Sequence, residues 1–284
     1  MLYKSCLSIL ICLFLTCTLF AQTNSDFPSG NLFIIGGGDR TDELVKSLIQ
    51  TAALSTKDYI AVLPMSSAEP DSSYYYIRWD LEKACSNPIV NLNFTKEQTG
   101  DKVRVDSVKH AKLIFITGGD QSRFMNVVIN TPLYDAIHEA YNNGSTISGT
   151  SAGAAVMSKL MITGNQLRGD TVYHSTFDRL WVNNIEFQQG LGLLDSVIID
   201  QHFVVRSRYN RMFSALAMYP SYTCIGIDEG TAIVVHRNKI KVVGESQVIV
   251  IKDPENLRTD GKGLIKLSDA KISIYTAGDS FDIK

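Results

Sequence analysis

The feature of this sequence that most restricts its fold is a regular alternation of apolar runs with amphipathic segments. The apolar runs, each ending in glycine or small polar residues, occupy 31–38, 59–67 and 111–121. Segments 41–54 and 132–144 carry apolar residues at helical spacing, with Thr41 as a candidate N-cap and Gly144 as a stop. Strands that are apolar throughout are typical of a parallel sheet buried on both faces. The pattern therefore predicts an α/β fold with a mainly parallel sheet covered by helices.

The second half of the chain continues this pattern and then changes it. Two more apolar runs, 195–203 and 223–235, carry acidic residues among their apolar ones. The C-terminal part, from "KIKVVGESQVIVIK" to "AKISIYTAGDSFDI", is β-like and indicates an antiparallel β portion. No repeat, low-complexity tract or linker interrupts residues 22–284, which we interpret as one domain.

Small and polar residues gather at the ends of the apolar runs. They are Gly36, Gly37, Gly38, Gly118–Gln121, Ser151, Asp200–His202, Asp228 and Glu229. In an open α/β sheet, ligands bind at the carboxyl ends of the strands. Such residues are a poor basis for a core, so we expect one site assembled from several loops.

The stretch "ISGTSAGAAVM" (147–157) places one serine on a predicted turn between a strand and a helix. Its segment GTSAG (149–153) fits the pattern G-x-S-x-G of a nucleophile elbow. In such a turn the hydroxyl of Ser151 projects outward, and the N–H groups of Ala152 and Gly119 are candidate oxyanion donors. The alternative is that the two glycines of the motif only let two layers of backbone pack closely. The motif alone leaves both interpretations open.

A nucleophilic serine needs a base, and the base needs an acid that orients it. His202 follows an apolar strand, whereas its competitor His174 lies in a polar segment without a strand. Asp228 and Glu229 close another apolar strand, and either could orient an imidazole. A structural role for His202, and a simple turn at the acidic pair, are the alternatives.

Composition argues against several classes of function. The chain of 284 residues has a net charge of −2 and no run of like charges, so we expect no binding of nucleic acid or an anionic membrane surface. The histidines are scattered and the cysteines lack metal-site spacing, so we expect neither a metal nor a cofactor. Cys85 and Cys224 could form one disulfide or remain two buried thiols.

The N-terminus has the layout of a secretory signal peptide. Lys4 precedes an apolar block from Leu7 to Phe20, and Ala21 stands before a polar stretch. We expect residues 1–21 to be removed and the protein to be secreted or periplasmic, without membrane attachment afterwards. One alternative is an uncleaved anchor, for which the block is short. Another is lipid attachment at Cys17, although "FLTC" matches a lipoprotein signal poorly.

Four segments carry a resemblance to a known family. They are "FITGGDQ" (115–121), "GTSAGAAVMS" (149–158), "IDQHFVVRSRYNR" (199–211) and "CIGIDEGTAIVV" (224–235). In order and spacing they resemble the signature segments of cyanophycinase and its relative aspartyl dipeptidase (peptidase E). "NLFIIGGG" and "ISIYTAGDSFDI" match the family's outer segments, so the resemblance covers almost the whole mature chain. It implies a three-layer, flavodoxin-like fold related to class I glutamine amidotransferases, and a serine peptidase that cleaves bonds next to aspartate.

Residue by residue, the resemblance implies Ser151 as nucleophile, His202 as its base and Glu229 as the acid. It also implies a substrate pocket formed by Gln121, Asp200, Gln201, Arg206, Arg208 and Arg211. Bidentate arginines would suit the free carboxylate of an aspartyl or β-aspartyl peptide, the expected substrate. The alternative is that the arginines are a solvated helix face. Cyanophycinase releases β-aspartyl-arginine dipeptides from the polymer cyanophycin, and the family suggests a homodimer.

Two features set this chain apart from cyanobacterial members of that family. Segment 164–194 is longer and rich in aromatic residues, and it could form a flap over the site. Its acidic residues, which are fallback candidates for the triad acid, are Asp170, Asp178 and Glu186. Secretion is unexpected for an enzyme that degrades its own cell's granules, so cyanophycin from other cells, isoaspartyl peptides and α-aspartyl peptides all remain candidate substrates. An esterase that uses the same elbow is one alternative function; a non-catalytic binding protein is less consistent with an intact triad.

Overall fold

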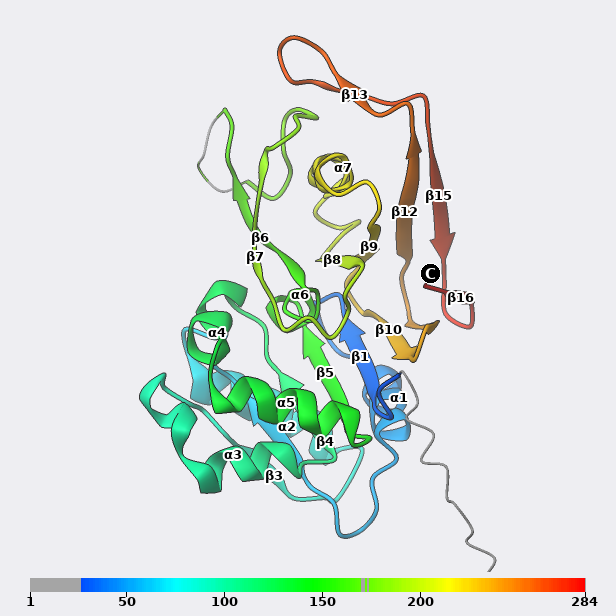
Figure 1. The fold of residues 1–284 in the computed structure, drawn as a ribbon. Helices are drawn as coiled ribbons and strands as arrows, with labels where there is room; N and C mark the ends of the chain where they lie inside the picture. Colours follow the sequence, from blue (N-terminus) through cyan, green and yellow to red (C-terminus); the bar gives the residue numbers. More distant parts are fainter. Residues whose placement is uncertain (1–26, 170–171, 173, 284) are drawn as a thin grey trace, which may run out of the picture.

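The centre of the computed structural model, which describes residues 27–169, 172 and 174–283, is an eight-stranded sheet of order β16-β11-β10-β1-β5-β4-β2-β3 (Figure 1). Its parallel strands are β1 Asn31–Ile35, β5 Thr146–Thr150, β4 Leu113–Ile116, β2 Ile60–Leu63 and β3 Ile89–Asn91. The antiparallel strands are β10 Thr231–His236, β11 Lys239–Gly244 and β16 Ser280–Asp282. The predicted α/β class, with a mainly parallel sheet and an antiparallel C-terminal portion, is confirmed.

Alternate residues of the parallel strands face opposite layers of helices. Phe33 and Ile35 belong to one buried cluster with residues of α1 and α2, and Leu32 and Ile34 belong to another with residues of α3, α4 and α5. The helices are α1 Asp42–Ala52, α2 Pro70–Glu82, α3 Lys102–Lys109, α4 Gln121–Val128 and α5 Pro132–Asn142, with a 3₁₀ turn at Glu97–Gly100. Burial on both faces explains why β2 and β4 are apolar throughout and β1 nearly so.

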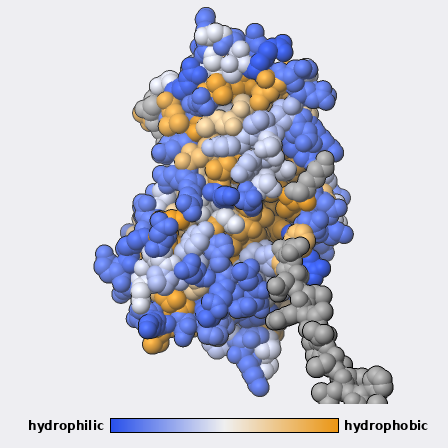
Figure 2. Space-filling model, in the orientation of Figure 1, coloured by the Kyte–Doolittle hydropathy of each residue, from blue (hydrophilic) through white to orange (hydrophobic). Residues whose placement is uncertain are grey.

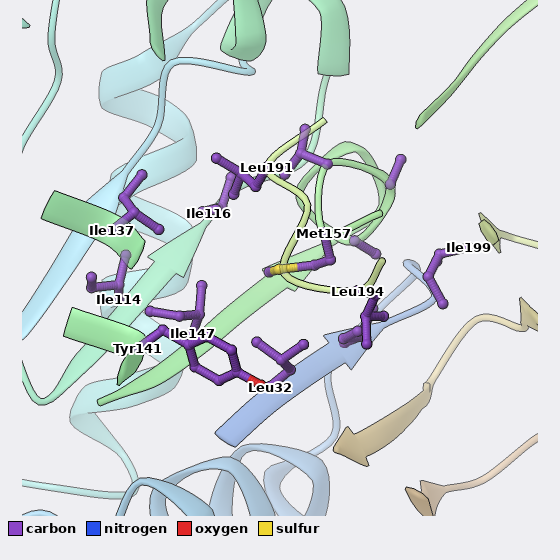
Figure 3. Close-up of a cluster of buried hydrophobic side chains, with 14 of the residues drawn as sticks. Leu32, Ile114, Ile116, Ile137, Tyr141, Ile147, Met157, Leu191, Leu194 and Ile199 are labelled. Atoms are coloured by element: carbon purple, nitrogen blue, oxygen red, sulfur yellow. The ribbon is translucent and has the colours of Figure 1, made fainter. Parts of the chain in front are cut away.

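A second, four-stranded sheet lies beyond β1, with the order β15-β12-β9-β8 (Figure 1). Its strands are β8 Val197–Gln201, β9 Thr223–Ile227, β12 Val248–Glu255 and β15 Asp269–Tyr275. Helix α7, Tyr209–Met218, packs on one of its faces through residues such as Met212 and Leu216. Its other face contributes Ile199 to the cluster shown in Figure 3, together with Leu32 and Ile147 of the first sheet. One continuous core therefore joins the two sheets.

The division into two sheets corrects one expectation. The apolar runs at 195–203 and 223–235 suggested further strands of one parallel sheet. The first run forms β8 and the second run forms two strands, β9 and β10. β8 and β9 are parallel to each other and pair within the second sheet, whereas β10 joins the first sheet, antiparallel to β1. A strand buried on both faces has the same apolar pattern in either sheet, so the sequence pattern could not distinguish the two arrangements.

The remaining elements are hairpins and local turns. Strands β6 Leu160–Gln166 and β7 Ile185–Gln189 form an antiparallel hairpin (Figure 1), whose Ile162 and Ile185 pack with Ile198 of β8 in one buried cluster. Strand β13 Arg258–Thr259 pairs with β14 Ile265–Lys266. The predicted cap of α1 is confirmed, since the Thr41 hydroxyl accepts from the Leu44 N–H at 3.3 Å. Helix α5 ends just before Gly144, which has a φ of +99°.

The remaining observations concern the surface, the two cysteines and the N-terminus. Hydrophilic residues cover most of the face shown in Figure 2, and no helix within the described residues is long and apolar enough to cross a membrane. Cys85 and Cys224 are free thiols, and complete burial raises the pKa of Cys224. The predicted leader, residues 1–21, lies outside the described residues.

Candidate active site

Ser151 stands on the sharp turn between β5 and the single helical turn α6, Ala152–Ala155. Its φ of +53° is rare for a residue with a side chain, and such strain is typical of functional turns. The Ser151 N–H donates to the carbonyl of Ile35 at 3.1 Å, which ties the turn to β1. A Cβ on Gly149 would lie 2.1 Å from the carbonyl oxygen of Gly153. Close backbone packing and a sharp turn with a half-buried serine therefore occur together at this motif.

A chain of hydrogen bonds links Ser151 to His202 and His202 to Glu229. The Ser151 Oγ lies 2.8 Å from Nε2 of His202, and the Nδ1 of His202 lies 2.5 Å from Oε1 of Glu229. A carboxylate can only accept, so Nδ1 carries the proton and Nε2 accepts from the serine hydroxyl. This tautomer is the one that a general base next to a serine requires. The competitor His174 is exposed in the segment after β6.

The environment of His202 favours its neutral form. Burial of the ring lowers the pKa of His202 below its ordinary value near 6.5, and the positive charges of Arg206 and Arg208 lower it further. The hydrogen bond to Glu229 acts in the opposite direction and raises the pKa, without reversing the shift. The imidazole is therefore unprotonated, and able to take a proton, at neutral pH.

Contact between the two sheets holds His202 in position. Its backbone N–H donates to the carbonyl of Gly36, in the loop after β1, at 2.7 Å. The adjoining Gly37 has a φ of +115°, and a Cβ there would lie 2.3 Å from Cε1 of His202. The glycines after β1 thus leave room for a ring that arrives from the other sheet. His202 itself has a φ of +48°.

Asp228 and Glu229 differ in what they contact, although they are adjacent in sequence. The Oδ1 of Asp228 accepts from the N–H groups of Val204 and Val205, both at 3.0 Å. Its Oδ2 accepts from the Ser246 hydroxyl at 2.7 Å. Asp228 therefore fixes the loop that follows His202, whereas Glu229 contacts the imidazole itself. The geometry makes Asp228 a positioning residue.

Two backbone N–H groups flank the serine. Ala152 follows it directly, and Gly119 lies in the loop after β4, where Gly118 approaches the Ser151 Cβ. Neither the Ala152 nor the Gly119 N–H donates to another residue within the described parts of the chain. Both are therefore open to an oxyanion that forms at the serine. α6 is too short to add much dipole, so these N–H groups are the relevant donors.

Two cavities meet at Ser151. The larger one has a volume of about 650 Å³ and includes His202, Tyr76 and Trp79 in its wall; we call it the aromatic cavity. Tyr76 and Trp79, on α2, are 65% and 56% exposed, so their rings are available to a ligand. His202 lines this cavity and not the second one, so a leaving group bound in the aromatic cavity would lie on the same side as the imidazole.

The second cavity, of about 430 Å³, contains the three arginines; we call it the arginine cavity. The predicted pocket residues in its wall are Gln121, Gln201, Arg206, Arg208 and Arg211. Gln121 reaches it from α4, and its amide nitrogen donates to the carbonyls of Ile162 and Thr163 at 2.9 and 2.7 Å. Gln121 therefore also anchors the β6–β7 hairpin.

Asp200 is a predicted pocket residue that lies outside the arginine cavity. It is 1% exposed and lines neither cavity. Its carboxylate accepts from Nε of Arg211 at 2.7 Å and also from Nη2 of that side chain. A carboxylate in the cavity would repel an anionic ligand, but here it lies behind Arg211 and orients the guanidinium. The expectation that Asp200 contacts substrate directly is wrong in this geometry.

The three arginines are also not equivalent. Arg211 is 2% exposed and bound to Asp200, and Arg208, equally buried, donates from Nη1 to the Gln201 carbonyl at 2.7 Å and to its side-chain oxygen. Arg206 is half-buried, and no other described residue bonds its guanidinium. The interpretation of the arginines as a solvated helix face is therefore wrong for Arg208 and Arg211.

Sequence reasoning missed one part of the wall of the arginine cavity. Residues of the β6–β7 hairpin line the arginine cavity; they are Thr163, Gly164, Asn165, Glu186 and Gln188. Glu186 was considered only as a fallback acid, but it lies in the arginine cavity, away from His202. The predicted flap segment 164–194 thus contributes a side wall. Among the described residues, no cluster of three or more His, Cys, Asp or Glu side chains could hold a metal ion.

Comparisons with known proteins agree with this geometry. A family model, peptidase family S51, matches residues 32–243. The cyanophycinase of Trichormus variabilis is 32% identical over 264 residues, which cover 89% of this chain and 85% of that protein. A peptidase E of a Nostoc species is 24% identical over 145 residues, which cover 51% of this chain and 57% of that protein.

Solved structures extend the likeness to the fold. A peptidase from an acI-B1 Actinobacterium has a TM-score of 0.66 with 24% sequence identity, over 89% of this chain and 97% of that one. At this identity the likeness concerns the fold alone, and it agrees with the flavodoxin-like class predicted from the sequence.

Proposed function

The chain belongs to peptidase family S51 and is a serine-type peptidase, and we propose that Ser151, His202 and Glu229 form its catalytic triad. We further propose that it hydrolyses aspartyl or β-aspartyl peptide bonds. The observation that carries both proposals is the hydrogen-bonded chain Ser151–His202–Glu229 at the junction with a cavity that contains three arginines.

Acylation starts with the Ser151 hydroxyl. As Oγ attacks the substrate carbonyl, Nε2 of His202 takes its proton, and Glu229 stabilises the imidazolium through Nδ1. The N–H groups of Gly119 and Ala152 then bind the oxyanion. The imidazolium donates its proton to the leaving amine, which departs through the aromatic cavity.

Deacylation reverses these roles with water. A water molecule enters from the side of the departed amine, and the neutral His202 takes its proton as it attacks the acyl group on Ser151. The tetrahedral intermediate is again held by the two N–H donors. Its collapse returns the proton to Ser151 and leaves an aspartyl product with a free carboxylate in the arginine cavity.

The arginine cavity supports an acidic residue on the acyl side of the bond. A guanidinium offers a planar fork that binds both oxygens of a carboxylate. Arg206 is the best placed to contact ligand directly, since its guanidinium is not bonded by another described side chain. Arg208 and Arg211 supply positive charge and are held by Gln201 and Asp200.

The cellular location is part of the proposal. The apolar block Leu7–Phe20 would direct export, after which the enzyme acts outside the cytoplasm on peptides that it encounters there. A secreted enzyme would meet cyanophycin from other cells or isoaspartyl and aspartyl peptides. Because cyanophycinases are among the similar proteins, cyanophycin is one substrate to test first.

The test is a mass-spectrometric screen of the purified mature protein. Four substrates are compared: β-Asp-Arg polymer, isoaspartyl dipeptides, α-Asp-X dipeptides and a neutral carboxyl ester. We expect cleavage of at least one aspartyl or β-aspartyl substrate, with the acidic residue released on the acyl side. Turnover of the neutral ester alone would instead support an esterase on the same fold.

A further inference from the structure

Two exposed aromatic rings of α2 form part of the wall of the aromatic cavity. Tyr76 and Trp79 are three residues apart on the helix, so their side chains lie on one face of it. Both are more than half exposed, and neither belongs to a buried hydrophobic cluster of the fold. Neighbouring exposed rings on a soluble protein are typical of a binding surface. Their place beside the serine turn therefore indicates that they bind part of the substrate.

The helix that carries these rings is fixed relative to the catalytic base. Asp80 of α2 accepts from Nε of Arg40 at 3.0 Å, and Arg40 lies in the loop between β1 and α1. The same loop contains Gly37, which leaves room for the ring of His202. The aromatic wall and the imidazole are therefore both held by one loop, and a group bound to the wall has a defined position relative to the base.

The aromatic cavity has the size and the wall of a site for a bulky side chain. Its volume of about 650 Å³ exceeds the 430 Å³ of the arginine cavity. Two buried side chains, Ile77 and Phe115, add apolar surface to its wall. Ligand sites of this size combine an apolar wall with a few polar groups. A leaving residue as small as glycine would leave most of this apolar wall in contact with water.

The charged groups of the cavity do not give it a strong preference for either sign. Arg40 and Asp80 form an ion pair at 2.9 Å and so neutralise each other. Asp39 and Glu69 also line the cavity, but both are exposed to water, which screens their charges. The electrostatic contribution of these groups to binding is therefore small.

A cation is also disfavoured at Trp79 itself. The ammonium of Lys83 lies 5.5 Å from the centroid of the Trp79 ring, so a cation of the chain already interacts with that ring. A second cation near the ring would be repelled by this ammonium, whereas a neutral ring would not. The two rings, rather than the charges, therefore determine which side chain fits.

We propose that the aromatic cavity binds the residue on the leaving side of the scissile bond and selects one with an aromatic side chain. The ring of that residue packs against Trp79 and Tyr76 in the offset or edge-on geometries that aromatic pairs adopt. Its amine then lies on the side of His202. The inference rests on the proposed function and adds the second half of the substrate: an acidic residue supplies the acyl group and an aromatic residue supplies the amine. Trp79 and Tyr76 are then specificity-determining residues.

The first experiment compares dipeptide amides that share an aspartyl acyl group and differ only in the leaving residue. The linkage is α or β, whichever the wild type cleaves, and the leaving residues are phenylalanine, cyclohexylalanine, lysine and glycine. For the wild type we expect kcat/KM to be roughly tenfold higher for phenylalanine than for glycine, with cyclohexylalanine between them. Trp79→Ala should lower kcat/KM for phenylalanine by roughly tenfold and for glycine by less than about twofold. Tyr76→Ala should act in the same direction, and Trp79→Phe should keep most of the preference.

Capture of the acyl-enzyme by added amines provides a second readout. An aspartyl methyl ester acylates Ser151 with release of methanol, and an added amine can then attack in place of water. The amine nitrogen bonds to the acyl carbon, the bond to Oγ breaks, and His202 transfers the amine proton to Oγ. An amine held in the aromatic cavity is already positioned for this attack, so phenylalaninamide should capture more of the acyl group than glycinamide at equal concentration. Trp79→Ala should remove this difference, whereas loss of a purely structural residue would lower both captures alike.

Trp181→Ala is the matched control. It removes the same kind of side chain, but Trp181 lines neither cavity, and its ring centroid lies 5.1 Å from the guanidinium of Arg168. It should leave the phenylalanine-to-glycine ratio and the capture ratio unchanged, and thermal melting should show that all variants fold.

Three outcomes would overturn the inference while the proposed function stands. They are equal kcat/KM of the wild type for phenylalanine and glycine, a higher kcat/KM for lysine than for phenylalanine, and equal losses on both substrates in Trp79→Ala. Failure of the wild type to cleave any aspartyl or β-aspartyl substrate would overturn the proposed function instead.

Discussion

The two sheets contribute different halves of the site, and they do so by different means. The eight-stranded sheet carries Ser151 and the loop with Gly119 on the neighbouring strands β5 and β4. His202 follows β8 of the four-stranded sheet, and Glu229 lies in the turn that leads from β9 of that sheet to β10 of the first. A local turn fixes the nucleophile, whereas docking of one sheet on the other places the base and its acid. The serine turn can therefore form without the triad, whereas the triad forms only when the two sheets dock on each other.

The two regions also differ in the charges of the groups that they place at or behind the site. Near Ser151 the groups available to a ligand are uncharged N–H donors. Behind the site, Asp200 of β8 and Arg211 of the helix α7 that covers the second sheet form a buried ion pair. The cost of taking both charges out of water offsets much of the attraction within such a pair, so its net contribution to stability is small. Removal of one partner, by contrast, leaves an uncompensated buried charge and is destabilising.

The largest effect is expected at the nucleophile. Ser151→Ala should lower kcat by about 10⁵- to 10⁶-fold, as loss of the nucleophile does in other serine hydrolases. The melting temperature should stay near wild type, because alanine fits the turn and the backbone hydrogen bond to Ile35 remains. Steady-state kinetics and a thermal melt measure the two quantities. Retention of even a tenth of the activity would remove Ser151 from the mechanism.

The next largest effect should separate the two adjacent acids. Glu229→Gln should keep the fold and lower kcat by roughly 10³- to 10⁴-fold, since His202 loses the partner that holds its tautomer. Asp228→Asn should keep kcat within about tenfold but lower the free energy of unfolding by about 1–2 kcal/mol, because the Ser246 hydroxyl loses its acceptor. Kinetics and urea unfolding of both variants supply the comparison. A reversal of the two kinetic results would make Asp228 the orienting acid.

We expect Arg206 to bind the substrate carboxylate and Arg211 to stabilise the fold around the arginine cavity. Arg206→Lys should lower kcat/KM for a carboxylate substrate by about 30-fold, which corresponds to about 2 kcal/mol. It should leave kcat/KM for a neutral ester and the melting temperature almost unchanged. Arg211→Met should instead destabilise the fold by about 3 kcal/mol, since the buried Asp200 then keeps only Arg208, at 3.5 Å, as a cationic partner. Equal kinetic losses on both substrates in Arg206→Lys would mean that Arg206 has a structural role.

The smallest effect concerns the pH dependence of the base. Because the pKa of His202 lies below its ordinary value, kcat/KM should fall only at acidic pH, as the imidazole becomes protonated and can no longer accept the serine proton. Arg206→Met removes a positive charge that lowers this pKa, so the acidic limb should move to higher pH. Glu229→Gln removes a group that raises it, so the residual activity should show the limb at lower pH. Shifts in the same direction would contradict this account of the His202 environment.

The sequence by itself determined the features that depend on neighbouring residues. The strand and helix alternation, the Thr41 cap and the serine turn at Ser151 each follow from a short contiguous pattern, because hydrogen bonds and packing within one element set its period. The four family segments also pointed to His202 and Glu229 through their order. None of these inferences required knowledge of which strands pair.

Tertiary structure alone decided what depends on contacts between distant residues. Asp228 and Glu229 are equivalent as a sequence pair, and only the docking of the second sheet turns Glu229 toward His202 and Asp228 toward the following loop. The same holds for Asp200, an acidic strand end that proves to be buried against Arg211, and for Glu186, which pairing of β6 with β7 brings into the wall of the arginine cavity. An apolar run or a carboxylate has the same local pattern whichever partner it meets, so the partner is settled only when the sheets pack together.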